Sequence, residues 1–356
     1  MGHRGPTGRG ASFNPPNRFE EITVGPPPED VAQYFDMPEP AGKIPTRFFV
    51  DRSFTVLSKN DSPDIWFTYS VNPYRGCEHG CVYCYARPSH EYLAFSSGLD
   101  FETNIMVKPD VAVLLERQFQ SHSWKPQVVA VSGNTDCYQP VEQKLCLTRK
   151  CLEVFLAFRN PLTITTKNAL VQRDLDLLKE LASLNLVHVS ISITTLNPDL
   201  ARRLEPRTSS PLKRLATVEA LARNGISVGV NVAPVIPGLT LSEMPAILHE
   251  AARRGAHSAG YQVLRLPYAV KDLMLEWLKR EVPMQAPKVI RQIRDLRDGY
   301  LSCSEFGERL RGSGPIAEAI DRLFETSCAR YRLNEQRREL SVGRFRRNVR
   351  NQLSMF

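Results

Sequence analysis

Short apolar runs alternate with amphipathic stretches through the middle of the chain. Six runs rich in valine and isoleucine predict strands, at residues 65–70, 128–132, 162–166, 187–193, 226–232 and 260–264. Between them, apolar residues recur every three or four positions and predict helices, at residues 109–121, 142–159, 170–184, 211–224 and 241–254. Near-continuous apolar strands separated by helices are typical of a parallel α/β sheet that is covered on both faces. Because a closed barrel of this kind takes eight strands, six strands predict a partial (β/α)6 TIM-like barrel.

The two ends of the chain lack this alternation, and the barrel is expected over residues 61–270. Nine prolines among the first 50 residues predict an irregular N-terminal arm over residues 1–60. Helical patterns without strands predict a helical extension over residues 271–335. The last segment, residues 336–356, carries six arginines against one glutamate and predicts a basic, flexible tail. Such a tail is either simply solvated or contacts phosphates.

Composition narrows the class of protein. No apolar run approaches the roughly 20 residues of a membrane helix, and the N-terminus lacks the apolar core of a secretory signal, which predicts a cytoplasmic protein without a membrane partner. Eight cysteines in 356 residues are too sparse for a disulfide framework and indicate metal or redox use. The net charge of +8 hints at an anionic partner.

Three of the cysteines are closely spaced. Cys77, Cys81 and Cys84 follow the pattern Cys-x3-Cys-x2-Cys, with the aromatic Tyr83 directly before the third. Three thiolates can hold one face of a cubane iron–sulfur cluster, which normally takes four cysteines. No fourth cysteine follows within 50 residues, so one iron would stay open to a substrate or cofactor, as in catalytic metal sites. A zinc site or an electron-transfer cluster without enzymatic function is the alternative.

Polar residues gather where the predicted strands end. In a parallel barrel the carboxyl ends of the strands meet on one face, where the chemistry is located. The sequence therefore predicts one polar pocket that faces the cysteine loop. The polar residues at these ends are Ser132, Gly133, Asn134, Lys167, Ser190, Ser192, Asn231 and Arg265.

The cysteine motif at the end of a first strand, before a β/α partial barrel, resembles the radical S-adenosylmethionine (SAM) superfamily. Further segments are similar to a bacterial branch of it related to spore photoproduct lyase: residues 72–77, 134–136, 166–167, 173–174 and 205–207. The resemblance implies an enzyme that uses a 4Fe–4S cluster to cleave SAM. The resulting 5′-deoxyadenosyl radical would abstract hydrogen from a substrate, and an electron donor of flavodoxin or ferredoxin type would reduce the cluster.

The resemblance also implies roles for individual residues. Cys77, Cys81 and Cys84 would be the cluster ligands, and Tyr83 would pack beside the cluster or the adenine. Lys167 is the candidate partner of the methionine carboxylate, as a lone cation on an otherwise neutral strand end. The remaining candidates are the segment that meets the methionine amino group and the residues that bind ribose or adenine: Ser132, Gly133 and Asn134 for the former, and Ser190, Ser192 and Asn231 for the latter.

Return of a hydrogen atom to the product radical needs a donor. Cys137 lies on the loop after the second predicted strand and is one candidate, because a cysteine has this role in spore photoproduct lyase. When Asp136 is matched to the corresponding aspartate of the lyase, however, the donor cysteine of the lyase falls opposite Gly133. Tyr85, next to Cys84, is an alternative relay.

The last five residues resemble the peptide by which bacterial DNA polymerases and repair proteins bind the sliding clamp. Leu353, Met355 and Phe356 would fill an apolar groove, with Gln352 as the polar anchor. This feature points to DNA and to the clamp as partners, and favours an enzyme of nucleic-acid repair or modification. A radical SAM enzyme that acts on a peptide or small molecule is the alternative.

Overall fold

A seven-stranded sheet forms the centre of the molecule in the computed structural model, which describes residues 6–19, 44–336 and 339–347. The strand order is β10-β9-β8-β7-β6-β3-β2; all neighbours pair in parallel except β2, which is antiparallel to β3. This arrangement confirms the predicted partial α/β barrel. The strands are β2 (Leu57–Lys59), β3 (Tyr69–Val71), β6 (Val129–Val131), β7 (Leu162–Thr166), β8 (Val187–Ser192), β9 (Ser227–Val235) and β10 (Ser258–Val263).

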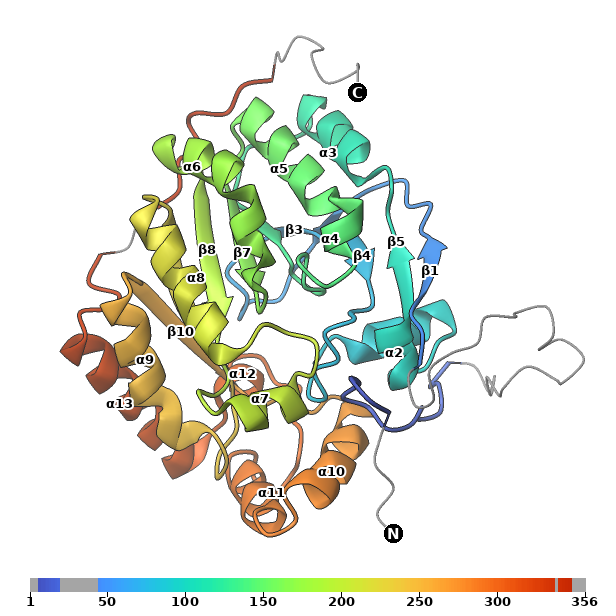
Figure 1. Cartoon of the computed structure of the whole chain (residues 1–356), viewed down its shortest axis with the longest axis vertical. Coiled ribbons are helices and arrows are strands. Elements are labelled where there is room, and N and C mark those ends of the chain that lie inside the picture. The colour runs from blue at the N-terminus through green and yellow to red at the C-terminus, as the bar shows by residue number, and fades with distance from the viewer. Residues whose placement is uncertain (1–5, 20–43, 337–338, 348–356) are drawn as a thin grey trace, which may run out of the picture.

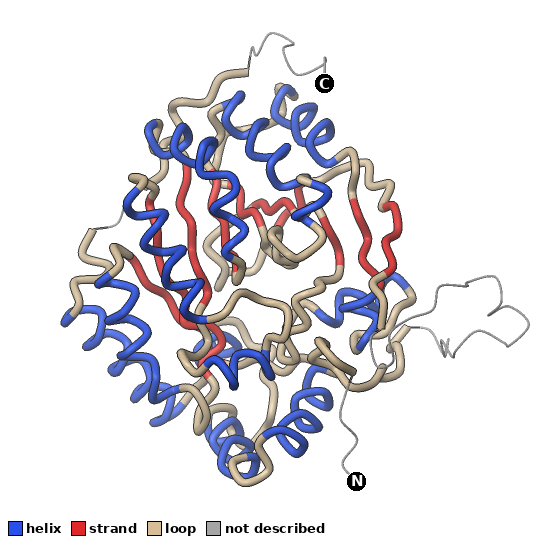
Figure 2. The backbone as a smooth tube through the Cα atoms, viewed as in Figure 1, coloured by secondary structure: helices blue, strands red, loops and turns tan. Residues whose placement is uncertain are grey.

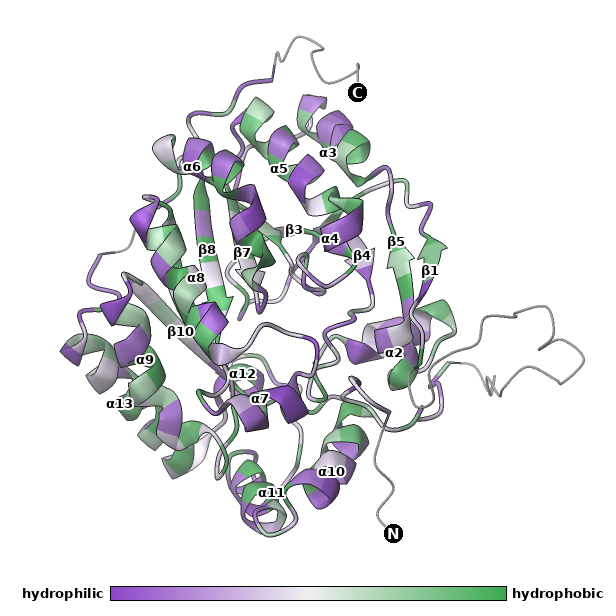
Figure 3. Cartoon of the chain, in the orientation of Figure 1, coloured by the Kyte–Doolittle hydropathy of each residue, from purple (hydrophilic) through white to green (hydrophobic). Residues whose placement is uncertain are grey.

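Helices cover the outer face of this sheet (Figure 1). In α8, the apolar Leu215, Val218 and Leu221 recur at helical spacing and are all buried, as the sequence pattern predicts. Figure 3 shows the corresponding mixture of apolar and polar positions around these helices. The covering helices are α3 (Val111–Gln120), α4 (Glu142–Leu145), α5 (Leu147–Phe158), α6 (Leu175–Ser183), α8 (Pro211–Arg223) and α9 (Met244–Arg253).

The inner face of the sheet is more polar than predicted. On β8, Val189 and Ile191 are buried, whereas His188, Ser190 and Ser192 line a cavity. Successive side chains of a strand point to opposite faces, so one face packs against the helices and the other faces the cavity. The strands are therefore not apolar on both faces.

The C-terminal extension is helical. The three helical stretches predicted there are present as α10 (Val270–Glu281), α11 (Ala286–Asp295) and α13 (Gly314–Arg330), with the short α12 (Glu308–Arg311) between the last two. Figure 1 shows α10, α11 and α7 (Pro198–Leu204) at the end of the molecule toward which β8 runs. In Figure 2, loops fill the space between the carboxyl ends of the strands and these helices. No helix in the described ranges is long and apolar enough to span a bilayer.

The N-terminal region contains strands that were not predicted. β1 (Arg47–Val50) pairs in parallel with β5 (Asn104–Val107), which is antiparallel to β4 (Tyr74–Arg75), and these three form a second small sheet beside α2 (Leu99–Thr103). Of the strand predicted at residues 65–70, only the end is a strand, as the start of β3. The preceding residues form a loop because Trp66 and Phe67 turn toward the cavity, and Asn60 bonds the Phe67 carbonyl at 3.0 Å.

Part of the expected flexible tail packs on the barrel. The N–H of Ser341 donates to Asn185 O, and that of Arg346 donates to Phe158 O, both at 2.9 Å. The Phe345 ring lies 6.3 Å from the rings of Phe119 and Phe158. These contacts are at the amino-terminal ends of the strands, where Glu339, Leu340 and Val342 close the floor of the cavity. The basic stretch docks because apolar residues are interspersed among its arginines. The clamp-like residues Gln352, Leu353, Met355 and Phe356 lie outside the described residues.

Two truncations separate these parts of the tail. Removal of residues 336–356 takes away the Phe345 contacts and the floor of the cavity, so we expect the free energy of unfolding to fall by about 2 kcal/mol. Removal of residues 348–356 alone leaves the Phe345 contacts and the floor in place and is expected to cost less. Urea unfolding followed by circular dichroism measures both. Equal losses in the two truncated proteins would contradict a structural role for residues 339–347.

Candidate functional site: a cavity lined by three cysteines

A cavity of about 1240 Å³ lies inside the barrel, between the cysteine loop and the floor described above. Cys77, Cys81 and Cys84 all line it. The polar strand ends are brought to the same cavity, as predicted from parallel topology. These lining residues are Tyr83, Tyr85, Ser132, Gly133, Asn134, Lys167, Ser190, Ser192, Asn231 and Arg265.

Cys137 is the exception among the candidates. It is fully buried in the apolar core and is not among the residues that line the cavity. Its backbone N–H donates to Ser132 Oγ at 2.6 Å, and its carbonyl accepts from Thr148 Oγ1 at 2.6 Å. This placement gives no support to the prediction that Cys137 donates hydrogen to a molecule in the cavity.

The backbone of the cysteine loop is held at several points. Gly76 (φ +79°) and Gly80 (φ +67°) take the left-handed conformation that favours glycine; the first lets the chain turn directly before Cys77 and the second between Cys77 and Cys81. The Cys77 N–H donates to Phe101 O at 2.9 Å, and the Val82 N–H donates to Leu204 O at 3.1 Å. The three thiols are therefore positioned by neighbouring segments on both sides.

A buried ion pair supports the loop from behind. The guanidinium of Arg87, in η2 (Arg87–Leu93), donates to the Cys81 carbonyl from Nε at 3.0 Å and from Nη2 at 2.9 Å, and pairs with Glu102. Both groups are fully buried. The Glu102 carboxylate also accepts from the N–H groups of Gly10 and Ala11, at 3.1 and 2.9 Å. The N-terminal segment is thus part of the support of the site.

Gly10 lies so close to the loop that a larger residue cannot fit. A Cβ at this position would lie 1.8 Å from the carbonyl oxygen of Gly80. We expect Gly10→Ala to displace the cysteine loop and to lower the free energy of unfolding by about 1–3 kcal/mol. Gly343→Ala is the matched control, because a Cβ there meets no atom within 4 Å. Thermal unfolding of both variants measures the effect; equal stability would show that the loop adapts freely.

The electrostatics of the thiols suit a positively charged partner. Burial raises the pKa of Cys77, Cys81 and Cys84, while Lys167 counteracts this rise for Cys81, as Arg87 and Lys167 do for Cys84. Iron supplies the positive charge that buried thiolates need. Within the described residues, no three His, Cys, Asp or Glu side chains are grouped to hold a single metal ion. Three thiols that line one cavity are the kind of donor set that a cluster uses, in which each thiolate binds its own iron.

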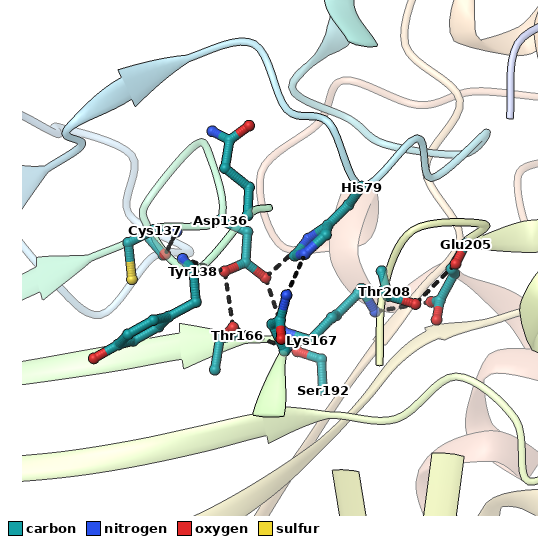
Figure 4. A network of polar contacts seen from close by, with 12 residues as sticks. His79, Asp136, Cys137, Tyr138, Thr166, Lys167, Ser192, Glu205 and Thr208 are labelled. Carbon is teal, nitrogen blue, oxygen red and sulfur yellow. Dashed lines mark hydrogen bonds and ion pairs between the residues drawn. The ribbon is translucent and has the colours of Figure 1, made fainter. Parts of the chain in front are cut away.

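Asp136 joins the cysteine loop to the strand ends (Figure 4). Its carboxylate lies 3.3 Å from His79 Nδ1 and accepts from Thr166 Oγ1 and from the Lys167 N–H, both at 2.8 Å. Burial alone would raise the pKa of Asp136, but His79 and the backbone N–H donors outweigh it and lower the pKa. From the sequence, His79 is considered only as a possible iron ligand and Thr166 only as part of a family-like segment, and neither contact with Asp136 is predicted. Their positions in the sequence could have indicated these contacts, because His79 lies in the cysteine loop and Thr166 directly precedes Lys167.

Lys167 is not the lone cation that the sequence suggested. Its Nζ lies 3.1 Å from Glu205 Oε1 and donates to Ala233 O at 2.8 Å. Glu205, at the end of α7, is buried and also pairs with Arg214. The pairing of Lys167 with Glu205 could not be predicted from the sequence, because the two residues are 38 positions apart in the chain.

Comparison with known proteins agrees with this geometry. A solved variant of spore photoproduct lyase superposes with a TM-score of 0.58 at 18% identity, over 80% of this chain and 78% of the lyase, and so shares the fold. An uncharacterized protein of Mycobacterium tuberculosis is 38% identical over 249 residues, 69% of this chain and 72% of that protein. One of Methanocaldococcus jannaschii is 30% identical over 171 residues, 48% of this chain and 61% of that protein. The family model of the radical SAM superfamily matches residues 71–251. The chain therefore belongs to the radical SAM superfamily and is an enzyme.

Proposed function

We propose that Cys77, Cys81 and Cys84 hold a 4Fe–4S cluster and that the enzyme acts on nucleic acid bound in the cavity. When bound, such a cluster supplies the electron that cleaves SAM, and the 5′-deoxyadenosyl radical then abstracts hydrogen from the substrate. The observation that carries this proposal is that three thiols, two buried and one half-buried, line the same cavity as the polar residues of the strands. The residues that line the cavity would keep water, and C–H groups other than those of the substrate, away from the radical.

The other cavity residues would orient SAM and the substrate. Ser132, Gly133 and Asn134 lie beside the cysteine loop, and the Tyr85 hydroxyl donates to Gly133 O at 2.9 Å. Lys167, fixed by Glu205, would meet the methionine carboxylate, and Ser190, Ser192 and Asn231 would bind ribose or adenine. Tyr83 packs against this group, because its hydroxyl bonds Glu205.

Tyr85 is the better-placed candidate for hydrogen return. It directly follows Cys84, lines the cavity and is 45% exposed, whereas the Cys137 side chain lies in the core. To give its hydrogen to a product radical in the cavity, the Tyr85 hydroxyl would have to turn away from Gly133 O.

Two observations favour nucleic acid as the substrate: the positive net charge of the chain and its structural similarity to spore photoproduct lyase. The chain has a net charge of +8, and a structurally similar spore photoproduct lyase has been solved in complex with a dinucleoside spore photoproduct (TM-score 0.57). A polymer of phosphates attracts a basic protein at long range. A flavodoxin- or ferredoxin-type protein would supply the electron. A peptide or small-molecule substrate is the alternative.

Deuterium tracing tests the proposal. The anaerobically reconstituted, reduced enzyme is incubated with SAM and with deuterated DNA, RNA or peptide, and 5′-deoxyadenosine is analysed by mass spectrometry. We expect deuterium in 5′-deoxyadenosine only with a nucleic acid. Transfer from peptide alone would overturn the substrate, and no 5′-deoxyadenosine under any condition would overturn the reaction.

A further inference from the structure

One cation that lines the cavity has no acidic partner in the part of the chain that the structure describes. Among the described residues, the lysine and arginine side chains that line it are Lys167, Arg265 and Arg311. Lys167 pairs with Glu205, and Arg311 lies 3.5 Å from Asp321. Arg265, two positions after β10, makes no hydrogen bond or ion pair with any residue that the structure describes; its guanidinium faces the Tyr85 ring at 5.8 Å. A partly buried charge in this state favours an anionic ligand.

A second arginine adds to the uncompensated charge. Arg297 is 4% exposed and donates from Nη2 to Leu264 O at 2.7 Å, but its Nε and Nη1 are buried without a hydrogen-bond partner among the described residues. Burial lowers the pKa of both arginines; Arg309 lowers that of Arg265 further, and Arg265 lowers that of Arg297. Arg265 lines the cavity, and Arg297, which bonds the carbonyl of the preceding residue Leu264, adds positive charge behind it.

The carboxylate that acts electrostatically on Arg265 already has a partner. Asp64 binds Arg309 through both carboxylate oxygens, with a 2.6 Å bond from Nε. Both residues act electrostatically on Arg265, which places them beside it. The ion pair of Asp64 and Arg309 is neutral as a unit, so the charge of Arg265 is not cancelled.

Exposed aromatic rings line the same cavity. Trp66, two residues after Asp64, is 67% exposed and lines the cavity together with Phe67 and Tyr85. Large exposed aromatic side chains next to arginine are the usual means of holding single-stranded nucleic acid, because every base has a face to stack and every linkage carries a negative charge. An acidic peptide would use the charge but would leave these rings without a stacking partner.

We propose that Arg265, backed by Arg297, is an anion subsite that binds a phosphodiester of the substrate, while Trp66 stacks on an adjacent base. This inference rests on the proposed function, since it names how that substrate is held. The carboxylate of SAM is the other anion that could reach this arginine, and the experiment separates the two sources.

The test measures binding rather than turnover. A fluorescent single-stranded hexathymidylate is titrated with the reconstituted full-length enzyme and followed by anisotropy, and SAM is titrated by calorimetry. Arg265→Gln is expected to weaken hexathymidylate binding about 10-fold and to reduce the slope of its salt dependence by about one, while SAM binding stays unchanged. Arg265→Lys is expected to recover part of the affinity. Arg253→Gln on the surface of α9 is the control.

Each contrary result has a distinct meaning. Weaker SAM binding with unchanged hexathymidylate binding would assign Arg265 to the cofactor and overturn the subsite. A hexathymidylate with neutral methylphosphonate linkages that binds as well as the charged one would overturn it too. Unchanged binding by Arg265→Gln would refute the subsite but leave nucleic acid as the substrate class, whereas no binding by the wild-type enzyme would refute both.

Discussion

Replacement of Cys81 by alanine is expected to eliminate iron–sulfur cluster binding and, with it, formation of 5′-deoxyadenosine. The proposed cluster would have three protein thiolates, one for each of three irons. The loss of a ligand is more severe than the loss of a residue that only orients one, which typically costs 10–100-fold in metal affinity. We therefore expect more than about a 100-fold decrease in 5′-deoxyadenosine formation, with loss of the visible iron–sulfur absorbance after reconstitution.

A matched cysteine distinguishes ligation from folding. Cys146, half-buried between α4 and α5, does not line the cavity, so Cys146→Ala is expected to keep the iron content and the absorbance. Cys81→Ser, which retains the size of the side chain, should lose the cluster like the alanine variant. If Cys81→Ala bound as much iron and sulfide as the wild-type protein, the assignment of Cys81 as a ligand would be refuted.

Most cavity residues could be predicted from the sequence, because residues that follow the strands of a parallel sheet come together on one face of the sheet. Ser132 and Lys167 directly follow β6 and β7, whose carboxyl ends meet, whereas Asn231 lies in the middle of β9, which runs further than predicted; all three line the cavity. No knowledge of side-chain contacts is needed for that step. The same argument holds for Arg265, whose lack of an acidic partner is visible only in the structure.

The residues that support the site were not predictable in this way. The Glu102 carboxylate accepts from the N–H of Gly10, 92 positions earlier in the chain, and pairs with Arg87, which holds the cysteine loop. These contacts follow no periodic pattern, because they depend on how loops fold back under the barrel. Cys137 is a residue for which the same rule fails. Its position just after a strand predicted that it would line the cavity, but the turn after β6 directs its side chain into the core.

Glu205 carries the largest expected effect on stability. Its carboxylate lies between Arg214 and Lys167 and also accepts from Thr194 Oγ1 at 2.6 Å. The side chains of Glu205 and Arg214 are each 1% exposed. Glu205→Gln keeps the shape but leaves two cations without their shared anion, a change that typically costs 3–5 kcal/mol in a buried pair. We expect the free energy of unfolding at pH 7 to fall by about 3 kcal/mol, measured by urea denaturation.

The pH dependence of this difference follows from the same charges. Burial would raise the pKa of Glu205, but Arg214 and Lys167 outweigh it and hold the pKa well below its usual range. A carboxyl group with a lowered pKa stabilises the fold fully above its unfolded pKa, about 4.3, and this contribution is lost as the pH falls through the folded value. The difference between wild type and Glu205→Gln should therefore be constant from about pH 6 to 8 and shrink below about pH 4.

An exposed ion pair and a double variant complete the test. Asp199→Asn removes the partner of Arg202 on α7, where both side chains are more than 70% exposed, and is expected to cost less than about 0.5 kcal/mol. Arg214→Met combined with Glu205→Gln should be less destabilised than the sum of the single variants, because each charge is costly mainly when the other is missing. Additive losses would show that Glu205 and Arg214 act independently. The position of Lys167 would then have to be fixed by a group other than the Glu205 carboxylate.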